Sequence, residues 1–523
     1  MLTGCVTSGG NDGETTDTIR GAWLTDPTTF DPAKVSGLDD FRAARLGFDT
    51  VLRRDDDGIV GGIATEYTQS PTNVTLTIRD DATCSDGTEI TPTVVADSLA
   101  RLASAETAST TAPLIFGGSP VTVTPDDAAG TVSIDLERAY SELAVGLTVP
   151  AAGIVCPAGL DDPEGLAAGT VDGAFSGPYA LTAATPGVTY EYTLRDGYDA
   201  WPVYAEPLEG TPAVTLDFSV GATDAVPNQL LTGELDAANV NVQDLPRFED
   251  GDFELNGSTV GDYFIIFNET ETSPFADPAV RKAAAQVIDP AGFMEAVNPA
   301  GQLNYSAGDP DLQCVNTDAS LMVEQDEEAA ASVLDGLTIR LIGTTGVGVN
   351  GAGNVYVQER LRAAGATVEL ANVDNGNWIT TILGPDTGSW DVTVFASINN
   401  VGTLVTGLSR VLGTSIEDGG RNIARSVNPT ATAAYTEALA ASDDTIKCEA
   451  YQRAQESVLD AVDFIPLSTN PATIVTADGF IPIPVHIRDQ LPPGTLLRID
   501  REEGGYLIVP EVIGQDPESE SKD

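Results

Sequence analysis

Hydrophobic and polar residues alternate along several short stretches of the chain, with the period of two that is typical of a strand with one buried face. The clearest example is 73–79, which reads NVTLTIR. The same reasoning predicts further strands at 19–24, 121–123, 132–136, 179–183 and 190–195.

Two other stretches predict helices. Between 41 and 52, hydrophobic residues such as Phe41, Ala44 and Phe48 recur near helical spacing. Thr91 and Pro92 predict the start of a second helix that extends to Leu102, because threonine is a favoured N-cap and proline fits the first turn. The DDDG at 55–58 predicts a tight turn, since it lacks the alternating ligands and distal glutamate of a calcium loop.

Length and charge restrict the classes of protein that fit. The 523 residues exceed what one hydrophobic core usually organises, so two or three domains are expected. The formal charge of -54, from 79 acidic and 25 basic residues, would repel phosphate backbones. Nucleic acid is therefore excluded as a partner.

The scarcity of cysteine and histidine limits the available chemistry. The five cysteines include no CxxC pair, so the usual structural zinc spacings are missing. The one histidine, His486, lies among prolines, and a loop or strand-edge position is expected for it. Paired carboxylates of the glycosidase type cannot be distinguished from surface charge in so acidic a chain. We expect neither a metal nor a cofactor.

The N-terminus has the features of a targeting signal. Leu2-Thr3-Gly4-Cys5 resembles the lipobox, after which a lipoprotein signal peptide is cut and whose cysteine is acylated. The following 6–17 reads as a flexible tether. We expect an extracytoplasmic protein that is anchored to the outer face of the cell membrane only through lipid on Cys5, with the signal peptide itself missing from this sequence. In the alternative interpretation, Cys5 is an ordinary thiol.

Several short motifs follow one another along the chain: FDP at 30–32, CSDGTEITP at 84–92, GPY at 177–179, GELD at 233–236, PFADPAVRKA at 274–283 and DFIPL at 463–467. In this order they resemble family 5 of the bacterial extracellular solute-binding proteins, which serve ABC importers of oligopeptides, dipeptides and nickel. Two departures are Cys84, where the family usually has an aromatic residue, and 92–95 in place of "AeDV".

The resemblance implies an α/β, two-lobed periplasmic-binding-protein-like fold (type II, cluster C) with an extra domain, in which mixed sheets are flanked by helices. It also implies a hinge between the lobes. The implied organisation is a tether at 1–17, domain I at 18–44, 166–262 and 473–510, domain II at 45–165, domain III at 263–472 and an acidic tail at 511–523.

The resemblance also implies three walls of a ligand cleft. Asparagines stand on the third wall where peptide-binding relatives commonly carry an aspartate for the ligand's α-amino group, so a neutral polar ligand is favoured over a free-amino peptide. As turn formers, these asparagines could instead be structural. The three walls are Ser36, Gly37 and Leu38; Asn239, Val240 and Asn241; and Ala396, Ser397, Ile398, Asn399 and Asn400.

Four cysteines remain once Cys5 is set aside, and they allow three pairings. Pairing Cys84 with Cys156 and Cys314 with Cys448 keeps each disulfide inside one expected domain, and an oxidising location makes disulfides plausible. Trp23, Trp378 and Trp390 could stack on a ligand, although core packing is the commoner fate of tryptophan.

One motif suggests a different chemistry. The GVGVNG at 346–351 is a literal GxGxxG between an expected strand at 337–342 and an expected helix at 355–364. Dinucleotide binding is disfavoured, because the surrounding chain lacks repeated strand–helix units and the charge opposes a pyrophosphate. In the resembled family, this place holds an ordinary strand, loop and helix.

These observations favour the substrate-binding component of an ABC importer, not an enzyme. It would capture a peptide-like or other small polar solute by hinge closure and deliver it to a membrane permease, and we expect a monomer. Two alternatives stay open: a secreted carboxylate-dependent hydrolase and a non-transport surface adhesion protein.

Overall fold

A computed structural model describes most of the chain. The described residues are 18–55, 58–204, 211–221, 224–249, 253–310, 312–384, 388–399, 401–477, 481–483, 496–500, 505–506 and 509–510. Cys5, Asn400, His486, the tether and the acidic tail lie outside these residues.

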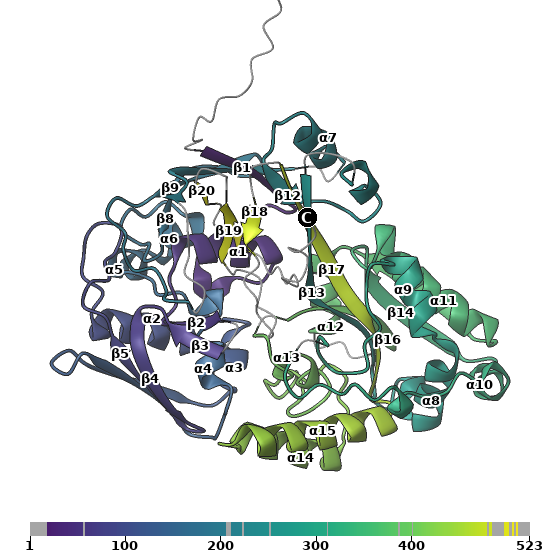
Figure 1. Cartoon of the computed structure of the whole chain (residues 1–523). Helices are drawn as coiled ribbons and strands as arrows, with labels where there is room; N and C mark the ends of the chain where they lie inside the picture. Colours follow the sequence, from purple (N-terminus) through teal and green to yellow (C-terminus); the bar gives the residue numbers. More distant parts are fainter. Residues whose placement is uncertain are drawn as a thin grey trace, which may run out of the picture.

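The molecule has two lobes that share one ten-stranded sheet (Figure 1). We call residues 18–249 the first lobe and residues 268–463 the second lobe. The long antiparallel strands β13 (Phe253–Phe267) and β17 (Phe464–Ala477) pair along most of their length at the centre of the sheet. They are the strands through which the two lobes are joined, consistent with the α/β fold class.

The sheet runs β15-β14-β16-β13-β17-β12-β1-β11-β9-β8. The second lobe supplies β14 (Thr338–Thr344), β15 (Thr367–Val373) and β16 (Val392–Ile398). The first lobe supplies β1 (Thr18–Trp23), β8 (Tyr179–Thr185), β9 (Thr189–Leu194), β11 (Thr215–Val220) and β12 (Ala237–Asn239).

The first lobe also contains a four-stranded sheet whose order is β4-β5-β7-β6. Val74, Leu76 and Ile78 are buried from one face of β5, as the alternation predicted. Thr91 caps α2 by accepting a hydrogen bond from the backbone N–H of Val94, and this also confirms the prediction. The elements are β4 (Ala64–Ser70), β5 (Asn73–Ile78), α2 (Pro92–Ala103), β6 (Val121–Asp126) and β7 (Thr131–Leu136).

The helix expected at 41–52 was predicted wrongly at both ends. In the structure α1 (Leu38–Gly47) begins three residues earlier, because the carboxylate of Asp40 accepts the backbone N–H groups of Ser36 and Gly37 and so caps the helix. The chain then turns into the hairpin of β2 (Leu52–Asp55) and β3 (Gly58–Gly61). Of the tight turn expected at 55–58, residues 56 and 57 lie outside the described residues, and Asp55 and Gly58 are paired in this hairpin.

The second lobe packs helices against β14, β15 and β16, and two further helices, α14 and α15, pack against each other at the bottom of Figure 1. The GxGxxG segment forms the connection from β14 to α11, as a strand, loop and helix. The amide of Asn354 fills the space beside this loop by donating to Thr344 O and to Asn372 Oδ1. The helices are α8 (Pro278–Val287), α9 (Pro290–Val297), α10 (Glu327–Leu334), α11 (Ala352–Ala363), α12 (Asn375–Ile382), α13 (Val405–Leu408), α14 (Pro429–Ala440) and α15 (Asp444–Asp460).

Short elements complete the described chain. The helices are α3 (Ala112–Ile115), α4 (Leu143–Gly146), α5 (Pro157–Asp161), α6 (Pro163–Ala168) and α7 (Val226–Leu231). The 3-10 helices are η1 (Pro32–Lys34), η2 (Pro150–Ala152), η3 (Leu245–Arg247), η4 (Pro274–Ala276), η5 (Ala319–Leu321) and η6 (Val349–Gly351). The strands are β10 (Thr211–Pro212), β18 (Ile481–Ile483), β19 (Leu496–Asp500), β20 (Gly505–Tyr506) and β21 (Val509–Pro510).

Two disulfides join the predicted cysteines. Cys84 is bonded to Cys156 in the first lobe, and Cys314 is bonded to Cys448 in the second lobe. Each bond ties segments of a single lobe, so neither restricts movement of one lobe against the other.

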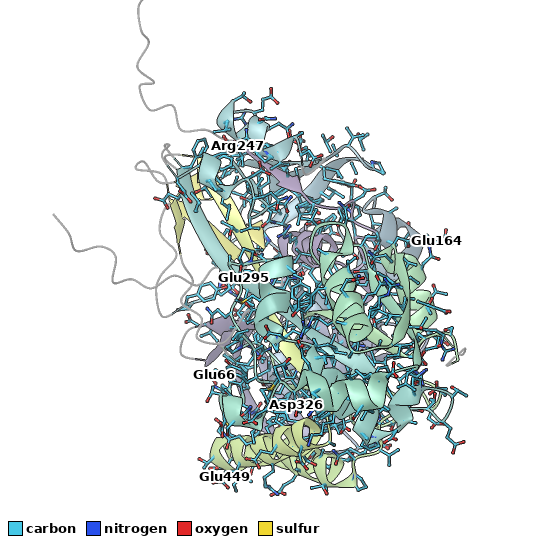
Figure 2. All side chains as sticks on the ribbon, turned by 90° about the vertical axis from the view of Figure 1, so that its right-hand side faces the viewer. Glu66, Glu164, Arg247, Glu295, Asp326 and Glu449 are labelled. Carbon is cyan, nitrogen blue, oxygen red and sulfur yellow. A yellow bond between two sulfur atoms is a disulfide. The ribbon has the colours of Figure 1, made fainter. Side chains whose placement is uncertain are left out.

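Charged side chains cover the outside of both lobes. Glu66, Glu164, Glu295, Asp326 and Glu449, which are labelled in Figure 2, are all exposed. Within the residues that the structure describes, no helix has both the length and the apolar character that crossing a bilayer requires.

Candidate functional site

A cavity of about 260 Å³ lies between the lobes. Its lining is largely polar and comes from both sides of the interface. The first lobe contributes Arg54, Asp55, Gly58, Ile59, Tyr67, Gln69, Ser141, Glu142 and Val145, and the second lobe contributes Gln313, Cys314, Gly402, Thr403, Leu404, Asp444, Lys447 and Tyr451. A molecule held here would contact both lobes at once.

Glu142 is the central acidic group of this cavity. It is buried on the first lobe, and it accepts a hydrogen bond of 3.0 Å from the hydroxyl of Tyr451 in α15. The Nζ atom of Lys447 lies 3.8 Å from Glu142 Oε1. Burial raises the pKa of Tyr451, and the charge of Glu142 raises it further, so this phenol stays protonated and donates to the carboxylate.

Direct hydrogen bonds connect the two lobes beside the cavity. The guanidinium of Arg54 donates to the carbonyl oxygens of Val401, at 3.1 Å, and Gly402, at 3.0 Å. The backbone N–H of Ser141 donates to Leu439 O at 2.7 Å. The structure therefore has the lobes in contact, with residues on opposite sides of the cavity hydrogen-bonded.

Hydrophobic packing extends across the same boundary. One core cluster includes Leu52 and Val149 from the first lobe together with Leu404 and Leu408 from the second lobe. These side chains are almost completely buried. The interface is thus formed by a core as well as by polar contacts.

The first predicted wall lies at the start of α1. The backbone N–H groups of Ser36 and Gly37 bind Asp40, and Leu38 is the first residue of the helix. Ser36 is exposed, whereas Gly37 and Leu38 are half-buried. None of the three lines the cavity, and their role in binding stays a prediction.

The second predicted wall lies at the end of β12. Asn239 is half-buried, Val240 packs with Val226 and Leu230, and Asn241 is exposed. The backbone N–H of Val240 donates to Thr473 O in β17. This wall is also separate from the residues that line the cavity.

The third predicted wall comes shortly before residues 402–404, which line the cavity. Ala396, Ser397 and Ile398 end β16, and Asn399 follows. The amide of Asn399 is used within the protein, because it donates to Asp309 Oδ2 at 3.2 Å and accepts the backbone N–H of Gly402 at 2.9 Å. Asn399 therefore shapes the loop that contains residues 402–404, and these three residues line the cavity.

The tryptophans belong to the core. Trp23 stacks on Phe218 with ring centroids 4.8 Å apart, and Trp390 is completely buried. Trp378 donates its indole N–H to Thr393 Oγ1.

Sequence reasoning missed Arg54 and Glu142. Arg54 precedes three aspartates in a predicted turn, which is the pattern of a solvated hairpin. Its partners at 401 and 402 are more than 340 residues away, and no local signal marks such a contact. Among the described residues, no group of three His, Cys, Asp or Glu side chains could hold a metal ion.

Comparison with known proteins identifies relatives over most of the chain. The family model described as bacterial extracellular solute-binding proteins, family 5 Middle, matches residues 58–416. No curated protein matches the chain in sequence.

Solved structures match over nearly the whole chain. A substrate binding protein from Microbacterium hydrocarbonoxydans, complexed with 4-hydroxybenzoate hydrazide, is 40% identical, with a TM-score of 0.81 over 89% of this chain and 96% of that one. AgaA from A.tumefacien R10, in complex with agropinic acid, is 20% identical, with a TM-score of 0.75 over 88% and 94%. Haemophilus influenzae OppA, in complex with the peptide RPPGFSPFR, is 17% identical, with a TM-score of 0.73 over 89% and 95%.

Proposed function

The chain belongs to family 5 of the bacterial extracellular solute-binding proteins, and we propose that it captures a small polar solute by closing its two lobes. Members of this family are extracytoplasmic, bind a ligand and deliver it to the permease of an ABC importer; they are not enzymes. The observation that carries the proposal is the polar cavity between lobes that are hydrogen-bonded to each other.

The size of the cavity favours a small solute over a long peptide. Its volume of about 260 Å³ lies at or below the lower end of ordinary ligand pockets. The 40% identical protein from M. hydrocarbonoxydans was solved with 4-hydroxybenzoate hydrazide, and this supports a ligand of similar size. The solutes in the other two structures, agropinic acid and a nonapeptide, differ widely from each other, so the fold alone does not select the ligand.

Closure would depend on a difference between the solute's affinities for the closed and the open state. β13 and β17 join the lobes, and a bend along these two strands would separate Arg54 from the carbonyl groups at 401 and 402. A solute that contacts both lobes binds the closed state more tightly than the open state, so it shifts the equilibrium toward closure. The closed protein is then the form that a permease recognises.

We also propose that Cys5 carries a lipid and that the tether holds a monomeric binding domain at the outer face of the membrane. The support for this anchor is the LTGC motif and the tether-like composition of 6–17. Mass spectrometry of the protein expressed behind a lipoprotein signal peptide should show acylated Cys5. A Cys5→Ser variant should be released into the soluble fraction.

The proposed function is tested on the purified full chain. Native mass spectrometry should detect a small solute that co-purifies. In thermal-shift measurements, at least one class of solute should raise the melting temperature. The classes to be tested are peptides, organic acids, hydrazides, opines, sugars and metal chelates. The solute should be recovered unchanged. Hydrolysis of any glycoside in a panel of substrates would instead support a hydrolase. Binding to another protein, with no solute that raises the melting temperature, would support an adhesion protein.

The Arg54 contact provides a prediction about closure. Arg54→Met removes the hydrogen bonds from a charged donor to Val401 and Gly402, so the dissociation constant of the stabilising solute should rise about tenfold, by isothermal titration calorimetry. The matched control is Arg138→Met, because the exposed Arg138 donates to Gly118 O inside the first lobe. Equal dissociation constants for Arg54→Met and the wild type would show that this contact does not contribute to closure.

A further inference from the structure

The cavity between the lobes contains a carboxylate with an unused oxygen. Glu142, on the first lobe, is only 3% exposed. Among the described residues, its side chain accepts one hydrogen bond, which the hydroxyl of Tyr451 donates to Oε1. The other oxygen, Oε2, accepts none and keeps some accessible surface. Because Glu142 lines the cavity, this oxygen is available to a solute.

A donor from the second lobe lies beside this acceptor. The Nζ atom of Lys447 is 3.8 Å from Glu142 Oε1 and 3.3 Å from Asp444 Oδ1. The first distance is too long for a direct hydrogen bond. An ammonium has three N–H donors, so at least one remains after both contacts. The cavity thus offers an acceptor from one lobe and a neighbouring donor from the other.

The charges that line the cavity are nearly balanced. Arg54 and Lys447 are basic, and Asp55, Glu142 and Asp444 are acidic. The side chain of Asp444 is 83% exposed, so its charge is the one that solvent screens most. A solute carboxylate would meet the like charge of Glu142, and a solute ammonium would meet that of Lys447. An uncharged solute avoids both repulsions.

We propose that Glu142 and Lys447 together select an uncharged solute that carries a primary carboxamide. This proposal rests on the proposed function and names the class of solute. A primary carboxamide has an acceptor and a donor on the same edge, so its oxygen can accept from Lys447 while its nitrogen donates to Glu142. A trans peptide bond points its C=O and N–H in opposite directions, so one peptide bond cannot satisfy both side chains.

The rest of the lining fits an apolar body attached to the carboxamide. Ile59, Tyr67, Val145 and Leu404 line the same cavity, and an apolar ring would be removed from water against them. Since the acceptor and the donor belong to different lobes, the carboxamide binds both only when the lobes are together. The same group therefore provides the preference for the closed state that closure requires.

The asparagines of the third wall also suggested a neutral ligand, but for a different reason. The amide of Asn399 donates to Asp309 and accepts from Gly402, so its hydrogen bonds are used within the protein. The choice of a neutral solute is assigned instead to the two charged side chains of the cavity.

The test uses the full chain and four probes that share one ring: benzamide, N-methylbenzamide, benzoate and benzylamine. Benzamide should raise the melting temperature. In isothermal titration calorimetry it should bind at least about tenfold more tightly than each of the others, because each of them leaves Glu142 or Lys447 without a partner.

Two variants should change the order of affinities in opposite ways. Glu142→Gln removes the charge that repels a carboxylate and adds an N–H donor, so benzamide should bind about tenfold more weakly and benzoate more tightly than to the wild type. Lys447→Met should weaken benzamide by a similar factor and strengthen benzylamine. The matched controls Glu164→Gln and Lys282→Met change exposed residues and should bind all four probes as the wild type does. A purely structural role would weaken all probes alike.

The assignment is overturned if the wild type binds any of the other three probes as tightly as benzamide, or if both variants keep the wild-type order. Should a variant fail to fold, the comparison of the four probes on the wild type still decides the question. If benzamide does not bind but another class of solute raises the melting temperature, the carboxamide assignment fails and the proposed function stands. If no solute at all stabilises the wild type, the proposed function itself fails.

Discussion

Replacing Arg281 with methionine is expected to lower the free energy of unfolding by about 3 to 5 kcal/mol, as for other buried ion pairs that lose one partner. Arg281 donates to Val462 O and Phe275 O, and its guanidinium lies 3.0 Å from Glu269 and 3.4 Å from Asp463. Methionine has a similar length but no charge. The variant leaves two carboxylates buried side by side without a cation.

The loss should depend on pH. Burial raises the pKa of Glu269 to about 8, the charge of Asp463 adds to this rise and Arg281 opposes it. Without Arg281, both carboxyl groups should bind protons still more tightly in the folded state than in the unfolded state. The free energy of unfolding of the variant then falls as pH rises above the pKa that these carboxyl groups have in the unfolded state. Urea unfolding should therefore show a larger difference between the wild type and Arg281→Met at pH 8 than at pH 5.

Two further variants test this explanation. Arg453→Met removes an exposed pair with Glu437 and should change the free energy of unfolding by less than about 1 kcal/mol. Adding Glu269→Gln to Arg281→Met should recover part of the loss, because only one buried charge then remains. A loss that is the same at pH 5 and pH 8, with no recovery in the double variant, would mean that packing and not charge explains the effect.

The framework of the fold could be predicted from the sequence because its signals are local. Period-two alternation located β5, and Thr91 with Pro92 marked the first turn of α2. The PFADPAVRKA motif did not show which acid Arg281 would meet, and in the structure its guanidinium lies 3.0 Å from Glu269 and donates to Val462 O. In that motif Phe275 lies in η4, and α8 begins only at Pro278, after its cap Asp277.

The contacts between the lobes could not be predicted in the same way. Arg54 meets Val401 and Gly402, and Ser141 meets Leu439, over sequence separations of about 300 residues or more. Such contacts depend on how the lobes pack, and local propensity contains no information about that.

One of the strands that join the lobes contributes to a buried pair of acids. Asp262 of β13 and Asp309 are both inaccessible to solvent, and they are hydrogen-bonded to each other. Burial raises the pKa of Asp262 well above its usual value, and the charge of Asp309 raises it further. Asn304 donates to Asp262 Oδ1 at 3.2 Å. A carboxyl that keeps its proton here can donate it to its neighbour.

Asp262→Asn should therefore change how stability depends on pH. In the wild type, the raised pKa means that the folded state keeps a proton that the unfolded state loses above about pH 4. The contribution of Asp262 to the free energy of unfolding therefore falls as pH rises toward its pKa in the folded state, by up to about 1.4 kcal/mol per pH unit. Asparagine can still donate to Asp309 and accept from Asn304, but it does not titrate. In urea unfolding, the variant should match the wild type near pH 4 and exceed it at pH 8.

The control is Asp161→Asn, because Asp161 is exposed in α5 and its replacement should leave the pH profile unchanged. Parallel profiles for Asp262→Asn and the wild type would show that the pair does not share a proton. A variant that is less stable at pH 8 would show that the ionised carboxylate of Asp262 stabilises the joining strands. The predicted divergence of the two profiles thus depends on the protonation state alone, because shape and hydrogen bonding are nearly the same in both proteins.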